Sequence, residues 1–253
     1  MAISARRVLV TGGTSGLGRA MVAALAAAGA RVALTGRSAA AAAAVAADLP
    51  GAAGVAMDVR EESSVAAAVG AAQALLGGID MLVNNAGIGM RTVNPHFMTR
   101  PQGFWEVQPD GFRAVIETNL TGYFLVAREV TPRMLAAGGG RIVNISVSDS
   151  TMRRAGFVPY GPSRAGSEAL SKIMAADLRD TSVTVNLLLP GGATVTGMLP
   201  PGTVPSEGQQ YLEPAVMGPP IVWLASDEAV GVHDERIIAA EFQRWLRDRN
   251  SRR

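Results

Sequence analysis

The chain contains no cysteine and only two histidines, His96 and His233. Without cysteine it forms no disulfide and offers no thiolate to a metal, and two isolated histidines do not supply a histidine-based metal site. We therefore expect no metal centre in this protein.

Long apolar runs are also absent from the sequence. A membrane-spanning helix needs roughly 18 or more consecutive apolar residues. Residues 1–7 lead directly into a predicted strand without the apolar core of a signal peptide. We expect a cytoplasmic protein that has no membrane partner.

Charge of neither sign is in large excess, because the formal net charge is +2 and charged residues make up 17% of the chain. This balance gives no electrostatic support for binding nucleic acid. Lysine is nearly missing, since Lys172 is the only one and the other basic residues are arginines. Several of these arginines fall in residues 241–253, which we interpret as a basic helix and tail.

Apolar residues make up 48% of the sequence, and short strand-like runs alternate with longer helix-like runs. Such alternation predicts βαβ units. Because no linker divides the chain, we expect one α/β domain over 1–253, a Rossmann-type doubly wound parallel β-sheet with helices on both faces. Strands are predicted at 8–10, 31–35, 54–59, 79–83, 140–146 and 183–189, and helices at 20–28, 38–49 and 63–76, the last capped by Ser63 and Ser64 and ended by Gly77.

A glycine-rich turn follows the first predicted strand, with the spacing G-x-x-x-G-x-G at Gly12, Gly16 and Gly18. Gly12 permits a turn that most side chains would block, and Gly16 lets backbone N–H groups approach an anion. Gly18 lets the following helix pack closely on the strand. The strand before this turn and the helix after it favour a phosphate cradle over a purely structural turn.

Two segments, 88–111 and 197–220, break the alternation because they are rich in proline and glycine. Both follow predicted strands, at the edge where ligands bind in open α/β sheets, so we interpret them as loops over a substrate pocket. For Phe104 and Trp105 we expect ordinary core packing. The candidate pocket residues are Met90, Phe97 and Met98, with His96 or an arginine selecting a polar group.

Five motifs together resemble the short-chain dehydrogenase/reductase family over almost the whole chain. They are T-G-x-x-x-G-x-G from Thr11, N-N-A-G at 84–87, Asn119 in a predicted helix, Tyr160 with Arg164 four residues later, and Pro190-Gly191 after the sixth predicted strand. The resemblance implies a nicotinamide cofactor bound at the glycine-rich turn. It also implies hydride transfer between that cofactor and a carbinol or carbonyl carbon.

The end of the predicted strand 31–35 favours NADP(H) as the cofactor. Enzymes that prefer NAD usually carry an acid there, which binds the adenosine ribose hydroxyls. This chain instead has Gly36, Arg37 and Ser38, and a guanidinium beside a hydroxyl suits a 2′-phosphate. The alternative is a surface arginine at the start of a helix.

The resemblance also assigns Asp58 to the adenine of the cofactor, with a helix cap as the alternative role. After Pro190-Gly191 the family has a threonine that bonds the nicotinamide amide, and two threonines bracket its place here. The predicted cofactor-binding set is Gly12, Thr14, Ser15, Gly16, Leu17, Gly18, Arg37, Ser38, Asp58, Val59, Asn85, Ala86, Gly87, Tyr160, Arg164, Pro190, Gly191, Thr194 and Thr196.

In this resemblance Tyr160 is the catalytic acid and base. A phenol with an ordinary pKa of about 10 needs a neighbouring cation to favour its phenolate, and a residue four positions along a helix lies on the same face. The family has lysine there, which also holds the nicotinamide ribose and passes protons on. Arg164 can supply the charge and the ribose contacts but cannot lose a proton as a relay. We expect Asn119 to anchor the relay through a water, although bonding backbone at a helix distortion is a further role.

The serine that orients the substrate in this family is displaced. An alignment without a gap puts Val147 in its place, flanked by Ser146 and Ser148. Since strand side chains alternate between faces, the two serines share one face and Val147 takes the other. We prefer Ser148 because it lies nearer the end of the strand and the pocket.

The sequence therefore predicts an NADP(H)-dependent oxidoreductase that acts on a secondary alcohol or ketone. One alternative is a cofactor-binding protein with little turnover, acting as a sensor or assembly partner. A halohydrin dehalogenase also carries a Ser-Tyr-Arg set, but such enzymes have an aromatic residue where Gly16 stands. The resemblance further implies a homodimer or homotetramer, paired through the helices of Asn119 and Tyr160, with Leu120, Phe124, Leu170 and Ile173 as candidate apolar contacts.

Overall fold

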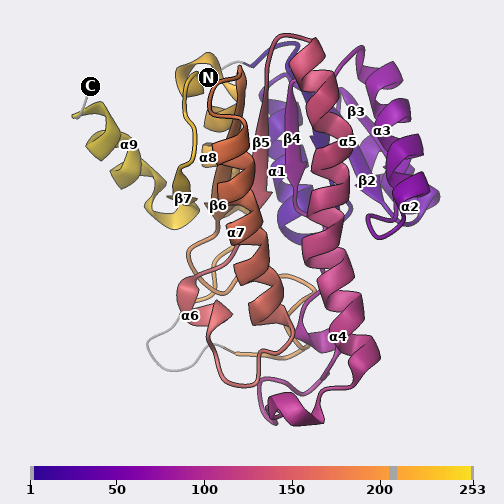
Figure 1. The fold of residues 1–253 in the computed structure, drawn as a ribbon, viewed down its shortest axis with the longest axis vertical. Coiled ribbons are helices and arrows are strands. Elements are labelled where there is room, and N and C mark those ends of the chain that lie inside the picture. Colours follow the sequence, from indigo (N-terminus) through magenta and orange to yellow (C-terminus); the bar gives the residue numbers. More distant parts are fainter. Residues whose placement is uncertain (1–2, 205–209, 252–253) are drawn as a thin grey trace.

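A computed structural model of the chain describes residues 3–204 and 210–251. Its strands form one parallel seven-stranded sheet in the order β3-β2-β1-β4-β5-β6-β7 (Figure 1). The strand order reverses direction between β1 and β4, so the predicted doubly wound α/β fold is confirmed. The strands are β1 (Arg7–Val10), β2 (Arg31–Gly36), β3 (Ala52–Ala56), β4 (Met81–Asn84), β5 (Gly140–Ile145), β6 (Val183–Leu189) and β7 (Arg236–Ile238).

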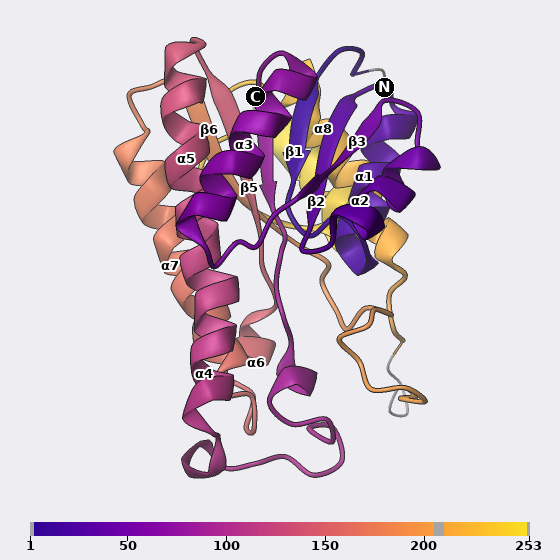
Figure 2. The ribbon, with the colours of Figure 1, turned by 90° about the vertical axis from the view of Figure 1, so that its right-hand side faces the viewer.

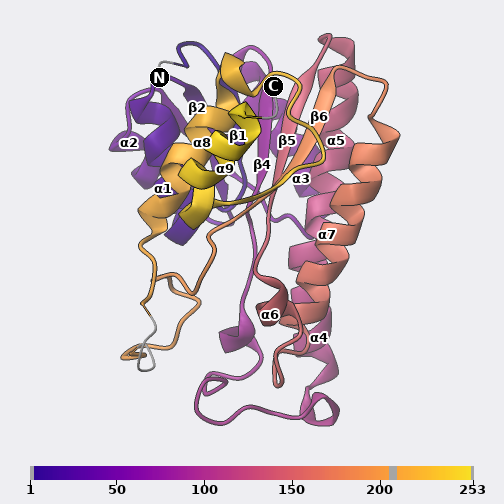
Figure 3. The ribbon, with the colours of Figure 1, turned by 90° about the vertical axis from the view of Figure 1, so that its left-hand side faces the viewer.

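Helices cover both faces of this sheet (Figures 2 and 3). One face carries α1 (Gly16–Ala27), α2 (Ala39–Ala47), α8 (Gly218–Ala225) and α9 (Phe242–Asn250), and the other carries α3 (Glu62–Leu76), α5 (Gly122–Ala136) and α7 (Tyr160–Asp177). Two shorter helices, α4 (Pro109–Ile116) and α6 (Asp149–Met152), lie beyond the carboxyl ends of the strands. The remaining turns of helix are η1 (Met90–Thr92), η2 (Phe104–Glu106), η3 (Glu117–Thr121, a π-helix), η4 (Pro214–Met217), η5 (Asp227–Ala229) and η6 (Ala239–Glu241).

Alternation along the buried strands divides the apolar core into two layers. In β1, Val8 and Val10 pack with α1 and α8 on one face, while Leu9 packs with α3 and α5 on the other. All three side chains are fully buried, as expected of a central strand covered on both sides.

The ends of several elements differ from the prediction. The helix over 63–76 begins one residue earlier and has Glu61 as its N-cap, without a side-chain capping bond. Ser64 does not cap it, because its hydroxyl accepts the backbone N–H of Asp58 at 3.0 Å. Gly77 does end this helix, with φ at +77°, so that part of the prediction is confirmed.

Both predicted loops lie beyond the carboxyl ends of the strands, but they are shorter than predicted (Figure 2). The first contains η1 and η2 and ends where α4 begins at Pro109. The second ends before η4 begins at Pro214, and its residues 205–209 lie outside the described residues. Of the predicted basic tail, residues 242–250 form α9, and Arg252 and Arg253 lie outside the description.

Within residues 3–204 and 210–251, no helix is long and apolar enough to cross a bilayer. The same residues contain no cluster of three or more acidic or histidine side chains placed to hold a metal ion.

Candidate active site

The turn that follows β1 and the turn that follows β4 are hydrogen-bonded to each other. The Asn85 side-chain amide donates to the carbonyls of Thr11 at 2.9 Å and Gly12 at 3.0 Å. The Thr11 hydroxyl in turn accepts the backbone N–H groups of Asn85 and Ala86 at 2.9 and 3.0 Å. Asn85 and Ala86 therefore fix the shape of the predicted phosphate cradle from the neighbouring strand.

The N-terminus of α1 opens onto this cradle. Its N-cap, Ser15, makes no side-chain capping bond, and its first turn carries no acid. Gly16 adopts φ of +52°, which favours glycine, and a side chain at Gly18 would collide with the carbonyl of Gly12. Uncapped N–H groups and the helix dipole suit an anion such as a pyrophosphate.

The end of β2 lies beside this turn and carries Arg37. A Cβ at Gly36 would stand 2.6 Å from Cγ2 of Thr14, so the position leaves room for Thr14 rather than for an acid. Arg37 is exposed. Ser38 is the N-cap of α2, because its hydroxyl accepts the N–H of Ala41 at 3.2 Å.

Asp58, after β3, is held by an arginine that the sequence analysis did not single out. Arg60 donates to both carboxylate oxygens of Asp58, at 2.9 and 2.6 Å. These hydrogen bonds from Arg60 lower the pKa of Asp58, and the nearby charge of Arg37 lowers it further. The alternative that Asp58 caps the following helix is wrong, because Glu61 is the N-cap of α3.

The segment after β6 brings one of the two predicted threonines to the glycine-rich turn. A Cβ at Gly16 would stand 3.3 Å from Cγ2 of Thr196. Thr194 is buried and pairs with Leu212 in an isolated bridge. Before them, Gly191 has φ of +99° in the turn that follows Pro190. Thr196 is thus the threonine placed toward the predicted cofactor site.

Arg164 is buried in the middle of the site, against Tyr160. It lies one turn beyond Tyr160 on α7, and its guanidinium carbon is 5.4 Å from the centroid of the Tyr160 ring. Both residues are buried, with exposed fractions of 3% for Arg164 and 8% for Tyr160. Glu168, one further turn along α7, pairs with Arg236 instead. Within the described residues, no carboxylate forms an ion pair with Arg164, so a buried positive charge faces the tyrosine.

Tyr123 on α5 is a site residue that the sequence analysis missed. Nη1 of Arg164 donates to the Tyr123 hydroxyl at 2.8 Å and to the carbonyl of Ile145 at 3.0 Å. The Tyr123 hydroxyl donates to the same carbonyl at 3.1 Å. Burial would lower the pKa of Arg164, but the facing phenols of Tyr123 and Tyr160 outweigh this and raise it. Tyr123 looks like an ordinary core aromatic in the sequence, and only the fold brings it to Arg164.

The other edge of the guanidinium faces Gly87. Nε of Arg164 is buried and has no hydrogen-bond partner in the described part of the chain. A Cβ at Gly87 would collide with Nη2, so the absence of a side chain there makes room for the guanidinium. Nε and Nη2 form a two-pronged donor edge that suits a pair of oxygen atoms.

Asn119 lies in the π-helix η3 and is fully buried. Its side chain accepts the N–H of Ile88 at 2.9 Å and donates to the carbonyl of Ile88 at 3.0 Å and to the Ser163 hydroxyl at 3.1 Å. The predicted role in bonding backbone at a helix distortion is therefore confirmed. Its part in a proton relay stays a prediction.

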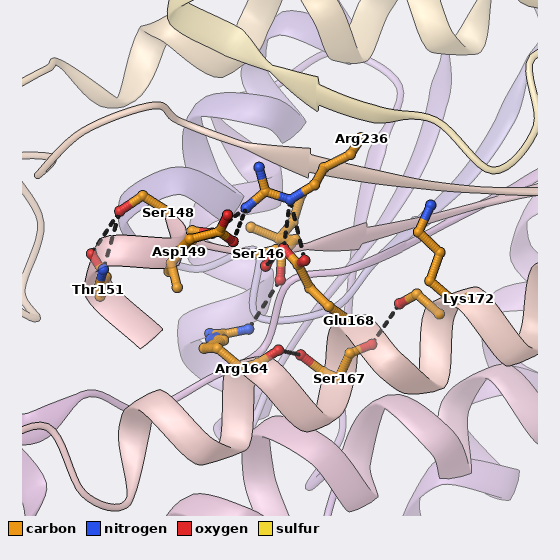
Figure 4. A network of polar contacts seen from close by, with 12 residues as sticks. Ser146, Ser148, Asp149, Thr151, Arg164, Ser167, Glu168, Lys172 and Arg236 are labelled. Atoms are coloured by element: carbon orange, nitrogen blue, oxygen red, sulfur yellow. Dashed lines mark hydrogen bonds and ion pairs between the residues drawn. The ribbon is translucent and has the colours of Figure 1, made fainter. Parts of the chain in front are cut away.

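The two predicted serines turn toward other partners (Figure 4). The Ser146 hydroxyl donates to Glu168 at 2.5 Å, and the Ser148 hydroxyl lies 2.9 Å from that of Thr151 as the N-cap of α6. Val147, between them, packs against the apolar cluster that contains Tyr160. The structure thus places Val147 against this cluster, while the hydroxyls of Ser146 and Ser148 bond other residues.

An apolar cluster surrounds Tyr160 and includes the predicted pocket residues of the first loop. Phe157 lies 6.4 Å from the Tyr160 ring and 5.5 Å from the Phe97 ring, measured between centroids. Phe104 and Trp105 were expected in the core, but they are 71% and 77% exposed, because η2 projects beyond the sheet. His96 is exposed as well. The cluster consists of Met90, Phe97, Phe157 and Tyr160, with Val93, Met98 and Val147 packed against it.

Comparison with known proteins relates the chain to one family. A model of the family described as short chain dehydrogenase matches residues 6–203. An acetoacetyl-CoA reductase of Shinella zoogloeoides is 34% identical over 232 residues, which cover 88% of this chain and 92% of that protein.

Two solved structures share the fold as well as part of the sequence. A 3-ketoacyl-(acyl-carrier-protein) reductase from Brucella melitensis, complexed with NADH, has a TM-score of 0.82 and 28% identity, covering 94% of this chain and 97% of its own. A short chain dehydrogenase from Burkholderia cenocepacia in complex with NADP has a TM-score of 0.79 and 26% identity, covering 94% of this chain and 98% of its own.

Proposed function

Because this chain belongs to the short-chain dehydrogenase family, we propose that it is an NADP(H)-dependent oxidoreductase of a secondary alcohol or ketone. The proposal depends above all on the position of Arg164, which is buried against Tyr160 and whose Nε has no hydrogen-bond partner in the described part of the chain. Relatives named as dehydrogenases and reductases support the reaction class.

The residues present fit a nicotinamide cofactor. The uncapped N-terminus of α1 suits the pyrophosphate, and Arg37 at the end of β2 suits the 2′-phosphate. The Nε and Nη2 edge of Arg164 suits the two hydroxyls of the nicotinamide ribose, and Thr196 suits the nicotinamide amide. When bound, the nicotinamide supplies or accepts the hydride.

The chain's own contribution to the chemistry is the movement of one proton at Tyr160. The phenol donates this proton to the substrate oxygen when a ketone is reduced and takes it back when an alcohol is oxidised. The guanidinium carbon of Arg164 lies 5.4 Å from the Tyr160 ring centroid, so its positive charge stabilises the negative charge that develops on oxygen during the transfer. The apolar side chains around Tyr160 exclude water and favour a substrate with an apolar body.

The test combines cofactor titration with turnover on a panel of ketones. Tyr160→Phe removes the hydroxyl but keeps the ring, so we expect turnover to fall by about 10²–10⁴-fold, the usual contribution of general acid–base catalysis. Cofactor binding, measured by the quenching of tryptophan fluorescence, stays close to that of the parent. A Tyr160→Phe protein that reduced ketones at the parental rate would overturn the proposal.

A second candidate function, cofactor binding without turnover, is favoured by the contact of Val147 with the Tyr160 cluster. The hydroxyls of Ser146 and Ser148 bond Glu168 and Thr151 and not the Tyr160 hydroxyl, so the substrate oxygen would have one hydroxyl donor rather than two. A sensor or assembly protein would bind NADPH and turn over no ketone in the panel. A halohydrin dehalogenase is disfavoured, because the glycine-rich turn is intact and no serine hydroxyl in the described chain joins Tyr160 and Arg164.

A further inference from the structure

The guanidinium of Arg164 is fixed from one side only. Its five N–H donors divide into two on Nη1, which bind Tyr123 and Ile145, and three on Nε and Nη2. Of the latter, the buried Nε has no hydrogen-bond partner in the described part of the chain. An arginine side chain has several rotatable bonds, so its orientation depends on the partners that hold it. Here the holding partners are a phenol on α5 and a carbonyl at the end of β5.

The two groups that accept hydrogen bonds from Nη1 are also hydrogen-bonded to each other. The Tyr123 hydroxyl donates to the carbonyl of Ile145 at 3.1 Å and accepts from Nη1 at 2.8 Å, while Nη1 reaches the same carbonyl at 3.0 Å. The Tyr123 side chain is 1% exposed, and burial raises the pKa of its hydroxyl, which keeps the phenol neutral and able to donate. The three groups form a closed triangle of hydrogen bonds.

Two aromatic rings also lie close to the guanidinium. Its carbon lies 5.6 Å from the Tyr123 centroid and 5.4 Å from the Tyr160 centroid. At these distances both rings attract the cation through their faces. Removing the Tyr123 hydroxyl would leave the ring attraction but take away the directional contact that orients Nη1.

We propose that Tyr123 is a positioning residue, whose hydroxyl holds Nη1 of Arg164 so that the Nε and Nη2 edge faces Gly87 and the cofactor. The proposal rests on the proposed cofactor role of Arg164. It assigns Tyr123 no contact with substrate or cofactor. Tyr123 acts only through Arg164, and this dependence is what an experiment can measure.

The experiment is a double-mutant cycle on the dissociation constant for NADPH, read by tryptophan fluorescence. We expect Tyr123→Phe to weaken NADPH binding about three- to tenfold, the effect of one lost hydrogen bond. In the Arg164→Met background the same substitution changes binding less than about twofold, because its target is gone. Thr131→Val is the matched control on the same helix, since the Thr131 hydroxyl bonds only the carbonyl of Ala127 among the described groups.

Thermal melts of all variants separate the effect on binding from an effect on folding. If Tyr123→Phe lowers the melting temperature too far, Tyr123→Met replaces it in the same cycle, since it also removes the hydroxyl while its flexible apolar side chain fills the buried space. A Tyr123→Phe effect of equal size in the two backgrounds would overturn the positioning role. Failure of the oxidoreductase proposal gives a different result, namely no turnover while the cycle still shows coupling. A parent that bound neither NADPH nor NADH would overturn both proposals.

Discussion

At the scale of single residues, the choice between the two nicotinamide cofactors depends on Arg37. Because its guanidinium is exposed beside the glycine-rich turn, we expect NADPH to bind more tightly than NADH by about 1–3 kcal/mol, the range of charge-assisted hydrogen bonds. Arg37→Asp should narrow or reverse this difference, measured as two dissociation constants. Arg19→Asp, on the exposed surface of α1, is the control for a general change of charge. Equal dissociation constants in the parent would contradict the assignment.

Val147 stands at the position where the sequence analysis expects the substrate-orienting serine. Its side chain packs in the Tyr160 cluster, so a hydroxyl at this position would face the substrate oxygen. We expect Val147→Ser to raise kcat for ketone reduction at least about tenfold, since a preorganised donor stabilises charge on that oxygen. Val230→Ser, at a position that is 63% exposed, should leave the rate unchanged. A Val147→Ser protein without any gain would mean that position 147 does not face the substrate.

At the scale of elements, the end of β5 is held from two sides. Arg164 and Tyr123 bind the carbonyl of Ile145, and Arg236 on β7 donates to the carbonyl of Val147 at 2.9 Å. Figure 4 shows Arg236 between Asp149 and Glu168, and Glu168 also accepts the Ser146 hydroxyl. This network holds the Ser146 hydroxyl, whereas the Ser148 hydroxyl is held by Ser150 and Thr151 at the start of α6.

An ion pair joins the first residue of β1 to the residue that precedes β4. Arg7 on β1 binds the carboxylate of Asp80, just before β4, with Nη2 at 2.5 Å, Nε at 3.0 Å and its backbone N–H at 2.9 Å. Burial would raise the pKa of Asp80, but the hydrogen bonds and charge of Arg7 outweigh it and lower the pKa below its ordinary value of 3.8. Because the pKa of Asp80 is lower in the folded chain than in the unfolded chain, its ionised carboxylate stabilises the fold at pH values above the unfolded pKa. This stabilisation is lost as the pH falls through the folded pKa.

We therefore expect Asp80→Asn to lower the free energy of unfolding at pH 7 by about 1–3 kcal/mol. The variant should also show a shallower loss of stability between about pH 5 and pH 2 than the parent. Denaturant titrations at several pH values measure both effects. Asp110→Asn is the control, because its pair with Arg113 is almost fully exposed and contributes little. Parallel stability curves for parent and Asp80→Asn would contradict the prediction.

The sequence was sufficient for β1 to β6 and for α1 to α3, because these strands are continuous apolar runs between glycines and helix caps. The glycine-rich turn was predictable from its spacing together with the strand before it and the helix after it, and the Asn85 side chain bonds the carbonyl of Thr11 there. Tyr123 could not be predicted, because 41 residues separate it from Arg164 and nothing local marks a buried phenol as polar. The direction of the Ser146 hydroxyl depends on Glu168, which comes from α7, and that of Ser148 depends on its place as the N-cap of α6, so alternation along one strand did not determine them.

At the scale of the whole molecule, the outer face of α5 and α7 carries apolar side chains that the fold leaves uncovered. Phe124 on α5 is 45% exposed and Ile173 on α7 is 58% exposed, and Leu120 and Leu170 beside them are half-buried. The two helices cover the same face of the sheet (Figure 1). Apolar side chains of this size on neighbouring helices are typical of a surface that pairs with a second copy.

We expect this surface to form a two-fold interface in a dimer or tetramer. Sedimentation velocity at micromolar concentration should then show no monomer in the parent. Ile173→Glu would place a charge in each half of the interface, twice across the two-fold axis, and burying an unpaired charge strongly disfavours association. The variant should therefore sediment at a lower mass with its fold intact by circular dichroism.

Leu75→Glu is the matched control, because Leu75 is a half-exposed apolar residue at the end of α3, and it should keep the parental mass. A parent that sediments as a monomer would contradict the interface, and an Ile173→Glu protein of unchanged mass would place it elsewhere. The coupling of Tyr123 with Arg164 lies inside one chain and would survive either result.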